Sequence, residues 1–482
     1  MSLDLLIVNP AASHGLYGPL GDSLIAVEPP IWARILAAYV RKRGFTVQII
    51  DAEAERMPIS HIAARAKNLR PRLIAIVAFG HQPSASTQQM YGASQAALQL
   101  CGISDLIMIG GHVAALPEQT LREESITFAC NGEGPLTLLG LLENKPLPEV
   151  PGLVWIDDGI LRQNPRAELP PVSELAGDAW DLLPMHLYRA HNWQCFGDLG
   201  SRQPYASIYT TFNCPYQCTF CCISAPFGNN RYLRRDPTEV VAEIKMLHDR
   251  YGVRTLKIAD EMFILTPSHY TAIAQGLIDE GLGDKMNIWA YARVDTVKPE
   301  TLGLLRKAGF RWLALGIESG SKFVRDGADK ILRNDDIVGV VRAIQEADIN
   351  VIGNYIFGLP DDTLASMQKT MELALECRTE FANFYSCMAY PGSKLYEEAV
   401  MSGVALPPSW KAYSQHNEDS FPLSTLHVSN RVVLKFRDEA FNAYFRDPDY
   451  LAMIEKKFGS ETLAHVKAMT TYKLKRKLLE HA

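Results

Sequence analysis

The stretch TTFNCPYQCTFCC, residues 210–222, places four of the nine cysteines of the chain within nine residues. It overlaps the end of a strand-like run, YASIYTTF (205–212). Cys214, Cys218 and Cys221 are spaced C-x3-C-x2-C, and a loop that carries three thiolates suits an iron–sulfur cluster. Three ligands leave one iron of a four-iron cubane open, so the pattern predicts a catalytic cluster that can bind a substrate or cosubstrate.

Two other interpretations, a structural zinc site and a pure electron carrier, fit the cysteine spacing less well. A structural zinc site uses four ligands that close the metal's coordination, and Cys222 is adjacent to Cys221 and poorly placed to be the fourth. A pure electron carrier would normally show a fourth cysteine with its own spacing. We expect Cys222 to be a small packed residue rather than a ligand or a hydrogen donor.

The cysteine loop opens a regular β/α alternation over residues 204–390. Asp236 and Pro237 signal the start of its first helix, as an N-cap and a first-turn proline. Six such repeats predict a partial (β/α)6 barrel, with functional residues at the carboxyl ends of its strands. The strands are expected at 205–212, 254–260, 286–291, 311–317, 350–357 and 381–387.

Residues 1–145 show a second alternation of continuous apolar runs and helical stretches. This pattern predicts a doubly wound, Rossmann-like parallel sheet, so the fold class is α/β. The ends of the strands are rich in Gly, Ser, Thr and His, which suits the approach of a phosphate or a large planar ligand. The strands are expected at 3–10, 45–50, 72–80, 105–111 and 125–130.

The remaining segments have weaker patterns. Residues 146–203 carry many Pro and Gly residues and are predicted to form a linker region, with a hairpin that turns at Asp158-Gly159. Residues 391–482 are predicted to be a mainly helical region that shapes the substrate pocket. Near its end, the basic run KLKRK (473–477) is interpreted as a solvated helix face.

Composition limits the classes of function. The formal net charge is -6, with 47% hydrophobic and 21% charged residues, which gives no signal for nucleic-acid binding. No apolar run reaches the roughly 18 residues of a membrane span. An odd number of cysteines without a signal peptide predicts a reducing, cytoplasmic location.

With Phe220 before the last cysteine, the loop resembles the signature of the radical S-adenosylmethionine (SAM) superfamily. The resemblance implies that Cys214, Cys218 and Cys221 hold a 4Fe–4S cluster whose open iron chelates the amino and carboxylate groups of SAM. Reduction would then cleave SAM to a 5'-deoxyadenosyl radical. The cofactor supplies this chemistry, while the protein positions it and keeps water out.

The same resemblance assigns contacts to the polar part of SAM. In LKIADEMF (256–263), Asp260 and Glu261 stand where the superfamily has an acid that accepts from the SAM amino group. The usual Gly-Gly before that acid is missing, so the choice between the two stays open. Arg293, in YARVDTV (291–297), is the expected partner of the SAM carboxylate.

Two further strand ends are similar to those that hold the nucleoside part of SAM. LALGIESGS (313–321) supplies Glu318 and Ser319 for the ribose hydroxyls. GNYIFGLPDDT (353–363) supplies Gly353, Ile356 and Gly358, which would let the adenine lie against the backbone. Cys387, on the last strand, is expected to be a buried small side chain rather than a radical quencher.

The first domain resembles the cobalamin-binding group of this superfamily. The D-x-H-x-x-G motif is absent, so the resemblance leaves the lower cobalt ligand open, and His14, His81 and His112 are interpreted as hydrogen-bonding loop residues. A sheet without a cofactor, or one that binds a nucleotide, are the alternatives. The resemblance assigns cobalamin contacts to Ser84, Ser86, Gly110, Gly111, Gly132, Glu133 and Gly134.

The combined resemblance implies a cobalamin-dependent radical SAM methyltransferase. The radical would take hydrogen from an unactivated carbon, and the substrate radical would take methyl from methylcobalamin. One alternative uses the same cofactors for oxidative ring closure, ring contraction or rearrangement; another is a non-catalytic redox or cobalamin sensor. The implied partners are a small-molecule substrate and an electron donor such as flavodoxin or ferredoxin, without nucleic acid or a membrane span.

Overall fold

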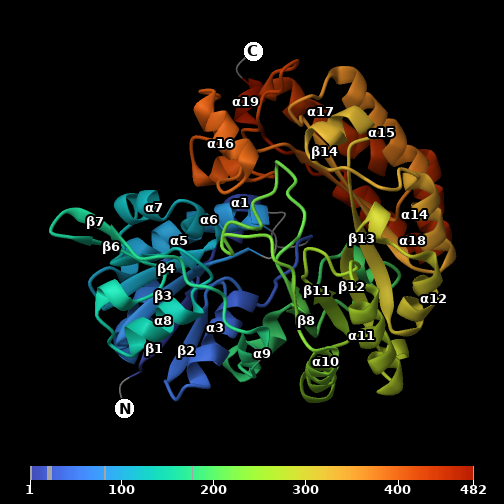
Figure 1. Ribbon diagram of the computed structural model, residues 1–482. Helices are drawn as coiled ribbons and strands as arrows, with labels where there is room; N and C mark the ends of the chain where they lie inside the picture. Colours follow the sequence, from blue (N-terminus) through green and yellow to red (C-terminus); the bar gives the residue numbers. More distant parts are fainter. Residues whose placement is uncertain (1–2, 19–23, 81–82, 176, 481–482) are drawn as a thin grey trace.

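The computed structural model describes residues 3–18, 24–80, 83–175 and 177–480. Figure 1 shows two α/β halves side by side, the first in blue and teal and the second in green to yellow. The C-terminal helices, in orange and red, lie along the second half and reach over the first. Among the described residues, no helix combines the length and the apolar character that crossing a bilayer requires.

The first half is built on a seven-stranded sheet of order β2-β1-β3-β4-β5-β6-β7. Its first five strands are parallel and confirm the predicted doubly wound sheet. Leu5 and Ile7 pack into one apolar cluster and Leu6 and Val8 into the other, because successive strand residues face opposite sides. The strands are β1 (Leu5–Asn9), β2 (Val47–Asp51), β3 (Leu73–Ala78), β4 (Asp105–Gly110), β5 (Phe128–Cys130), β6 (Leu153–Asp157) and β7 (Ile160–Gln163).

The hairpin predicted in the linker region is present, but it is not separate from the first half. β6 pairs antiparallel with β5 and with β7, so the hairpin extends the edge of the first sheet. Asp158 has φ 48° and Gly159 φ 78°, the positive values of a two-residue hairpin turn. The segment therefore continues the sheet that precedes it, because its strands satisfy the backbone of β5.

Helices cover both faces of the first sheet (Figure 1). Residues of α3 and α8 belong to the same apolar cluster as the second half, so the two halves share a continuous core. The helices are α1 (Ser13–Tyr17), α3 (Ile31–Arg41), α4 (Ile59–Leu69), α5 (Pro83–Leu100), α6 (Gly111–Ala115), α7 (Pro117–Glu123), α8 (Pro135–Leu142) and α9 (Val172–Leu175).

The second half contains a six-stranded, all-parallel sheet of order β15-β14-β13-β12-β11-β8. It confirms the predicted partial barrel, which is open between β15 and β8. The cysteine loop lies between β9 and β10, a short antiparallel pair that follows β8. The strands are β8 (Tyr205–Ile208), β9 (Thr211–Phe212), β10 (Leu233–Arg234), β11 (Thr255–Ile258), β12 (Asn287–Arg293), β13 (Phe310–Glu318), β14 (Asn350–Phe357) and β15 (Phe381–Ser386).

The helices of the second half lie outside its curved sheet (Figure 1). As predicted, Asp236 caps the first of them, since its carboxylate accepts from the backbone N–H of Thr238 at 2.8 Å. The helices are α10 (Pro237–Tyr251), α11 (Pro267–Asp279), α12 (Pro299–Lys307), α13 (Lys322–Gly327), α14 (Ile337–Glu346) and α15 (Leu364–Cys377). Short 3-10 helices are η1 (Leu147–Glu149), η2 (Trp180–Leu182), η3 (Met185–Leu187), η4 (Trp193–Cys195), η5 (Gly283–Lys285), η6 (Val294–Thr296) and η7 (Trp410–Tyr413).

The C-terminal region contains α16 (Lys394–Met401), α17 (Asn430–Phe445), α18 (Pro448–Met469) and α19 (Lys477–Glu480). The interpretation of residues 473–477 as a solvated helix face holds for the exposed side chains of Lys473, Lys475 and Lys477, but the helix and the exposure of Arg476 are wrong. Residues 473–476 are not helical, and Arg476 is only 4% exposed. Its guanidinium forms two hydrogen bonds with Asp438, and this pairing accounts for the burial of a charge that the sequence pattern placed in solvent.

Candidate active site between the two sheets

A cavity of about 740 Å³ lies between the two halves, and this volume suits a ligand of substantial size. Asn9 and Phe79 reach it from strand ends of the first sheet, and Lys257 and Trp289 from the inside of the second. The C-terminal region contributes α17 and the segment that follows α18. The first sheet thus offers the carboxyl ends of its strands, where parallel sheets bind ligands, whereas the second sheet contributes residues from within its strands, such as Ala314 and Ile352. None of the residues predicted to bind the cluster or SAM is part of this lining.

The three cysteines of the C-x3-C-x2-C pattern are half-buried on one loop. Burial raises the pKa of the Cys214 thiol to about 11, and burial also raises that of Cys221 well above its usual value. Burial raises the pKa of Cys218 too, against the opposing effect of Lys330 and Arg293. Within the described residues, no three or more His, Cys, Asp or Glu side chains are grouped so that they could bind one metal ion, whereas a cubane cluster takes each thiolate on a different iron.

Cys222 directly follows the last cysteine of the pattern, but its side chain is packed elsewhere. It is 7% exposed and packs in a cluster with Met388, Tyr390 and Tyr413. The prediction that Cys222 is a small packed residue is confirmed. Cys387, 3% exposed, likewise packs in an apolar cluster, as expected of a buried small side chain.

The adjacent acids Asp260 and Glu261 have different environments. Asp260 is fully buried and accepts hydrogen bonds from the backbone N–H of Thr210 at 2.6 Å and from its hydroxyl. By contrast, Oε2 of Glu261 is buried without a hydrogen-bond partner among the described residues. Burial raises the pKa of Glu261 to about 8. Asp260 therefore holds the β8 end in place, and Glu261 is the acid with an unused acceptor.

Arg293, at the end of β12, lies beside the cysteine loop. Its guanidinium carbon is 3.9 Å from the ring centroid of Tyr216, a residue between the first two cysteines. The guanidinium also donates to Asp295 at 3.0 Å and to the carbonyl of Ile331 at 2.6 Å. Because Tyr216 and Asp295 hold the guanidinium, Arg293 is a fixed positive charge next to Cys218.

Glu318 ends β13 with φ 65°, at a shift in the register between β13 and β14. A side chain in the left-handed region is strained, and such strain is concentrated at functional sites. Its Oε1 lies 2.9 Å from Nζ of Lys330, and both side chains are at least 90% buried. Lys330 was not predicted, because it follows α13 and has no strand end or motif to mark it.

The remaining residues predicted to bind SAM are Phe220, of the cysteine loop, and those assigned to the nucleoside part of SAM. Phe220 and Ile356 are half-buried and pack against the same apolar cluster, so the fold brings them together. Ser319 is buried and its hydroxyl bonds that of Thr370 at 3.1 Å. A Cβ at Gly353 would lie 2.7 Å from the ring of Tyr355, on the opposite face of β14 from the cavity.

Gly358 has a packing role that the sequence did not reveal. Its φ is 85°, and a Cβ at this position would lie 2.5 Å from Cγ1 of Val433 on α17. A glycine is therefore required for the close approach of α17. The assignments of Ser319, Gly353 and Gly358 to SAM stay predictions.

Part of the predicted cobalamin set surrounds a narrow gap between the first half and the cysteine loop. Ser86 accepts from the backbone N–H of Gly80 at 3.1 Å, and a Cβ on Gly111 would lie 3.0 Å from its hydroxyl. Gly110 approaches β3 closely, because a Cβ there would lie 2.4 Å from the carbonyl oxygen of Ala78. Ser84 lies in α5, but its side chain is outside the described part of the structure.

Of the three histidines predicted to form hydrogen bonds in loops, His112 is the one whose side chain the structure describes. His112 lines the same gap and packs edge-on against Trp410, with ring centroids 4.7 Å apart. Nδ1 of His112 is buried without a hydrogen-bond partner among the described residues. The expected hydrogen bond is therefore not formed at this atom. Burial lowers the pKa of His112 to about 4. His81 and the side chain of His14 are outside the described residues.

The loop of Gly132, Glu133 and Gly134 follows β5 and does not line either of the two spaces above. Glu133 is 2% exposed, and burial raises its pKa to about 7, an effect that Arg166 partly opposes. Gly134 has φ 102° and packs against Ile109, while a Cβ at Gly132 would lie 3.8 Å from Cγ of Arg166, an ordinary contact. The contacts of all three residues with cobalamin stay predictions.

Each half of the protein matches the sequence model of a known family. The family model described as "Radical SAM superfamily" matches residues 208–374, and the one described as "B12 binding domain" matches residues 19–142. The chain is a cobalamin-dependent radical SAM enzyme. The resemblance carried by the cysteine loop and by the first sheet is confirmed.

Similar proteins support this membership along most of the chain. An uncharacterized methyltransferase of Pyrococcus horikoshii is 27% identical over 459 residues, which are 93% of this chain and 94% of that protein. An anaerobic magnesium-protoporphyrin IX monomethyl ester cyclase of Cereibacter sphaeroides is 26% identical over 402 residues, 80% of this chain and 62% of the cyclase. The radical SAM methyltransferase TsrM from Kitasatospora setae has the same fold, with a TM-score of 0.68 at 14% identity over 98% of this chain and all of TsrM.

The residues of this radical SAM enzyme fit the cofactors that the family implies. Three half-buried thiols with raised pKa values need a positive group to become thiolates, and the iron ions of a cluster supply that charge. The unpartnered Oε2 of Glu261 suits an ammonium donor such as the amino group of SAM. The large cavity, open to strand ends of the first sheet, offers space for a cobalamin.

Proposed function

We propose that this enzyme transfers a methyl group to an unactivated carbon of a small molecule. When bound, the cluster and SAM would supply a carbon-centred radical and cobalamin a methyl group. Cys214, Cys218 and Cys221 would hold the cluster, Glu261 would accept from the SAM amino group, and Arg293 would face its carboxylate. The observation that carries the proposal is the single cavity lined by strand ends of the first sheet and by the inside of the second.

The chain's own residues would orient these groups and keep the site dry. Glu318, fixed by its ion pair with Lys330, would accept from the ribose hydroxyls of SAM. Trp289 and Tyr291 line the cavity with apolar surface that limits water. Exclusion of water matters because it prevents side reactions of reactive intermediates.

A second function uses the same residues for ring closure without methyl transfer. The similarity to the anaerobic cyclase of Cereibacter sphaeroides, over 80% of this chain, favours this alternative. In both functions we propose an external one-electron donor such as flavodoxin or ferredoxin. All nine cysteines are free thiols, which supports a reducing compartment such as the cytoplasm.

The test is an anaerobic assay of the reconstituted full chain with SAM, cobalamin and a reductant. Mass spectrometry would score 5'-deoxyadenosine and S-adenosylhomocysteine separately, with and without cobalamin. Methyl transfer predicts both products, the second dependent on cobalamin. Deoxyadenosine alone would favour ring closure, and neither product would favour a non-catalytic sensor.

A further inference from the structure

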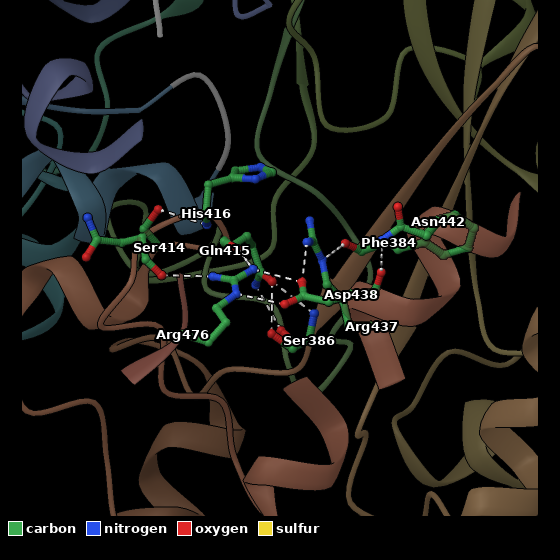
Figure 2. A network of polar contacts seen from close by, with 10 residues as sticks. Phe384, Ser386, Ser414, Gln415, His416, Arg437, Asp438, Asn442 and Arg476 are labelled. Atoms are coloured by element: carbon green, nitrogen blue, oxygen red, sulfur yellow. Dashed lines mark hydrogen bonds and ion pairs between the residues drawn. The ribbon is translucent and has the colours of Figure 1, made fainter. Parts of the chain in front are cut away.

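One wall of the large cavity carries a network of buried charged and polar side chains that none of the cofactor assignments uses. Figure 2 shows this network, which joins α17, the segment after η7, the end of β15 and the C-terminal segment. Gln415, His416, Arg437, Asp438 and Asn442 belong both to the network and to the lining of the cavity. The network is thus exposed to whatever the cavity holds.

Arg437 is the member with an unused donor. It is 5% exposed, and its Nε donates to the carbonyl of Phe384 at 2.8 Å. Its Nη1 donates to Oδ1 of Asp438 at 2.8 Å. Nη2 has no partner among the described residues, and Figure 2 shows one terminal nitrogen without a dashed line, on the side toward which the ring of His416 projects.

The charge of Asp438 is already balanced by another residue. Arg476 donates to both of its oxygens, each at 2.8 Å, and its remaining Nη1 donates to the carbonyl of Asn417 at 2.8 Å. Two guanidinium groups therefore face one carboxylate, and one positive charge of the network is unbalanced. His416 does not change this sum at neutral pH, since burial and the two arginines lower its pKa to about 3.

The guanidinium of Arg437 faces the cavity and is held in a rigid setting, which suits the recognition of a ligand. Gln415 accepts from the backbone N–H and the hydroxyl of Ser386, each at 2.9 Å, and donates to the Ser386 carbonyl at 2.9 Å. These bonds fix the segment beside Arg437 to the end of β15. An unbalanced buried charge costs free energy unless a ligand of opposite charge neutralises it.

The aromatic residues that line the cavity indicate the chemical character of the rest of the ligand. Phe384 and Tyr385 line the cavity from β15, Phe441 lines it from α17, and Trp289 and Tyr291 line it from β12. This surface suits a large apolar or aromatic body rather than a small polar metabolite.

We propose that the substrate is an amphipathic oxyanion, an apolar body with a carboxylate or phosphoryl group that Arg437 binds through Nη2 beside His416. This inference rests on the proposed function, because it takes the large cavity as the substrate site. Arg437 is then a binding residue, while Asp438, Arg476 and Gln415 are positioning residues.

The test measures binding rather than turnover. The full chain, reconstituted with cluster and cobalamin and saturated with SAM but not reduced, is titrated by calorimetry with 1-naphthaleneacetate, 1-naphthyl phosphate and the neutral 1-naphthaleneacetamide. We expect the wild-type protein to bind at least one anion about tenfold more tightly than the amide, since hydrogen bonds between charged groups are strong. The tighter of the two anions identifies carboxylate or phosphoryl as the recognised group.

Variants locate the preference. Arg437→Gln should lose about tenfold in affinity for the anion and keep its affinity for the amide, which also reports an intact cavity. Arg437→Lys should still prefer the anion. The control Arg446→Gln removes another arginine that lines the cavity, one that donates to the Thr470 carbonyl at 2.7 Å, and should leave the preference unchanged.

Two outcomes would overturn the proposal: a wild-type protein without preference for either anion, or an Arg437→Gln variant that keeps the preference. The first needs no variant, so the test does not depend on the folding of Arg437→Gln. A protein that prefers anions but forms no deoxyadenosine would retain this inference and refute the proposed reaction. The reverse result would leave the reaction and refute the inference.

Discussion

The ammonium of Lys257, on β11, lies 3.1 Å from the carboxylate of Glu28, which precedes α3 in the other half of the protein. The two side chains are 3% and 8% exposed, and the ammonium also lies 5.0 Å from the ring centroid of Trp289. This ion pair joins the two halves inside the cavity that both of them line. It therefore ties the two sheets together across the cavity.

Breaking this ion pair should destabilise the protein strongly. Lys257→Met leaves the carboxylate of Glu28 buried without its cation, and we expect the free energy of unfolding to fall by about 3–5 kcal/mol. The double variant Lys257→Met/Glu28→Gln should lose less than the sum of the two single changes. Urea unfolding measures all three; Lys245→Met, at an exposed pair with Asp249, should change stability by less than about 1 kcal/mol.

The two adjacent acids should separate SAM binding from folding. Glu261→Gln removes an unused carboxylate, so we expect about tenfold weaker binding of SAM to the reconstituted protein and a nearly unchanged unfolding midpoint. Asp260→Asn disrupts the bonds with Thr210 and should lower the unfolding midpoint instead. If Asp260→Asn weakens SAM binding while Glu261→Gln does not, the assignment is reversed.

The adjacent cysteines should differ in iron binding. Cys221→Ser removes a predicted cluster ligand, so the reconstituted protein should lose most of its iron and its visible absorbance. Cys222→Ser changes a residue that packs against Met388 and Tyr390, and it should keep both. Iron analysis after reconstitution decides the matter, and equal loss in both variants would contradict the ligand assignment.

Substitutions at Gly358 and at Val433 of α17 should have non-additive effects on stability. Gly358→Ala places a Cβ 2.5 Å from Val433, so we expect a loss of about 1–3 kcal/mol in the free energy of unfolding. In Gly358→Ala/Val433→Ala the collision is removed, and the double variant should lose less than the sum of the single losses. Strict additivity in urea unfolding would show that the contact carries no strain.

Glu133 should make the unfolding free energy of the cofactor-free chain depend on pH. Burial raises its pKa from 4.5 to about 7, so between these values the folded state binds more protons than the unfolded state. Stability from this group is present below about pH 4.5 and is lost as the pH rises to about 7, by roughly 3 kcal/mol. Urea unfolding at pH 5–8 should show this decline in the wild-type protein and a flatter curve in Glu133→Gln.

A matched exposed residue controls for general charge effects. Glu143, whose side chain is 40% exposed, lies at the end of α8, shortly after Glu133. Glu143→Gln should keep the decline of the wild-type protein. A curve for Glu133→Gln that is as steep as that of Glu143→Gln would show that other groups cause the decline.

The local patterns of the sequence predicted most of the architecture. Continuous apolar runs such as Leu73–Ala78 form buried parallel strands, because both faces of such a sheet are covered by helices. The spacing of Cys214, Cys218 and Cys221 after β8 predicted the cluster ligands, since ligands close in sequence need only one loop to bring them together. The residue pair Asp158-Gly159 predicted a hairpin turn, because it supplies the positive φ values that the turn requires.

Only the tertiary structure decided which polar residues work together. Glu318 with Lys330, and Lys257 with Glu28, have no spacing that would pair them, and each pair forms because the folded chain buries both charges in one place. The same holds for Arg476, which the sequence placed in solvent and the fold joins to Asp438. Local sequence determined the strands and the cluster loop, whereas the cavity and its unbalanced charge at Arg437 arise from long-range burial, which no local pattern encodes.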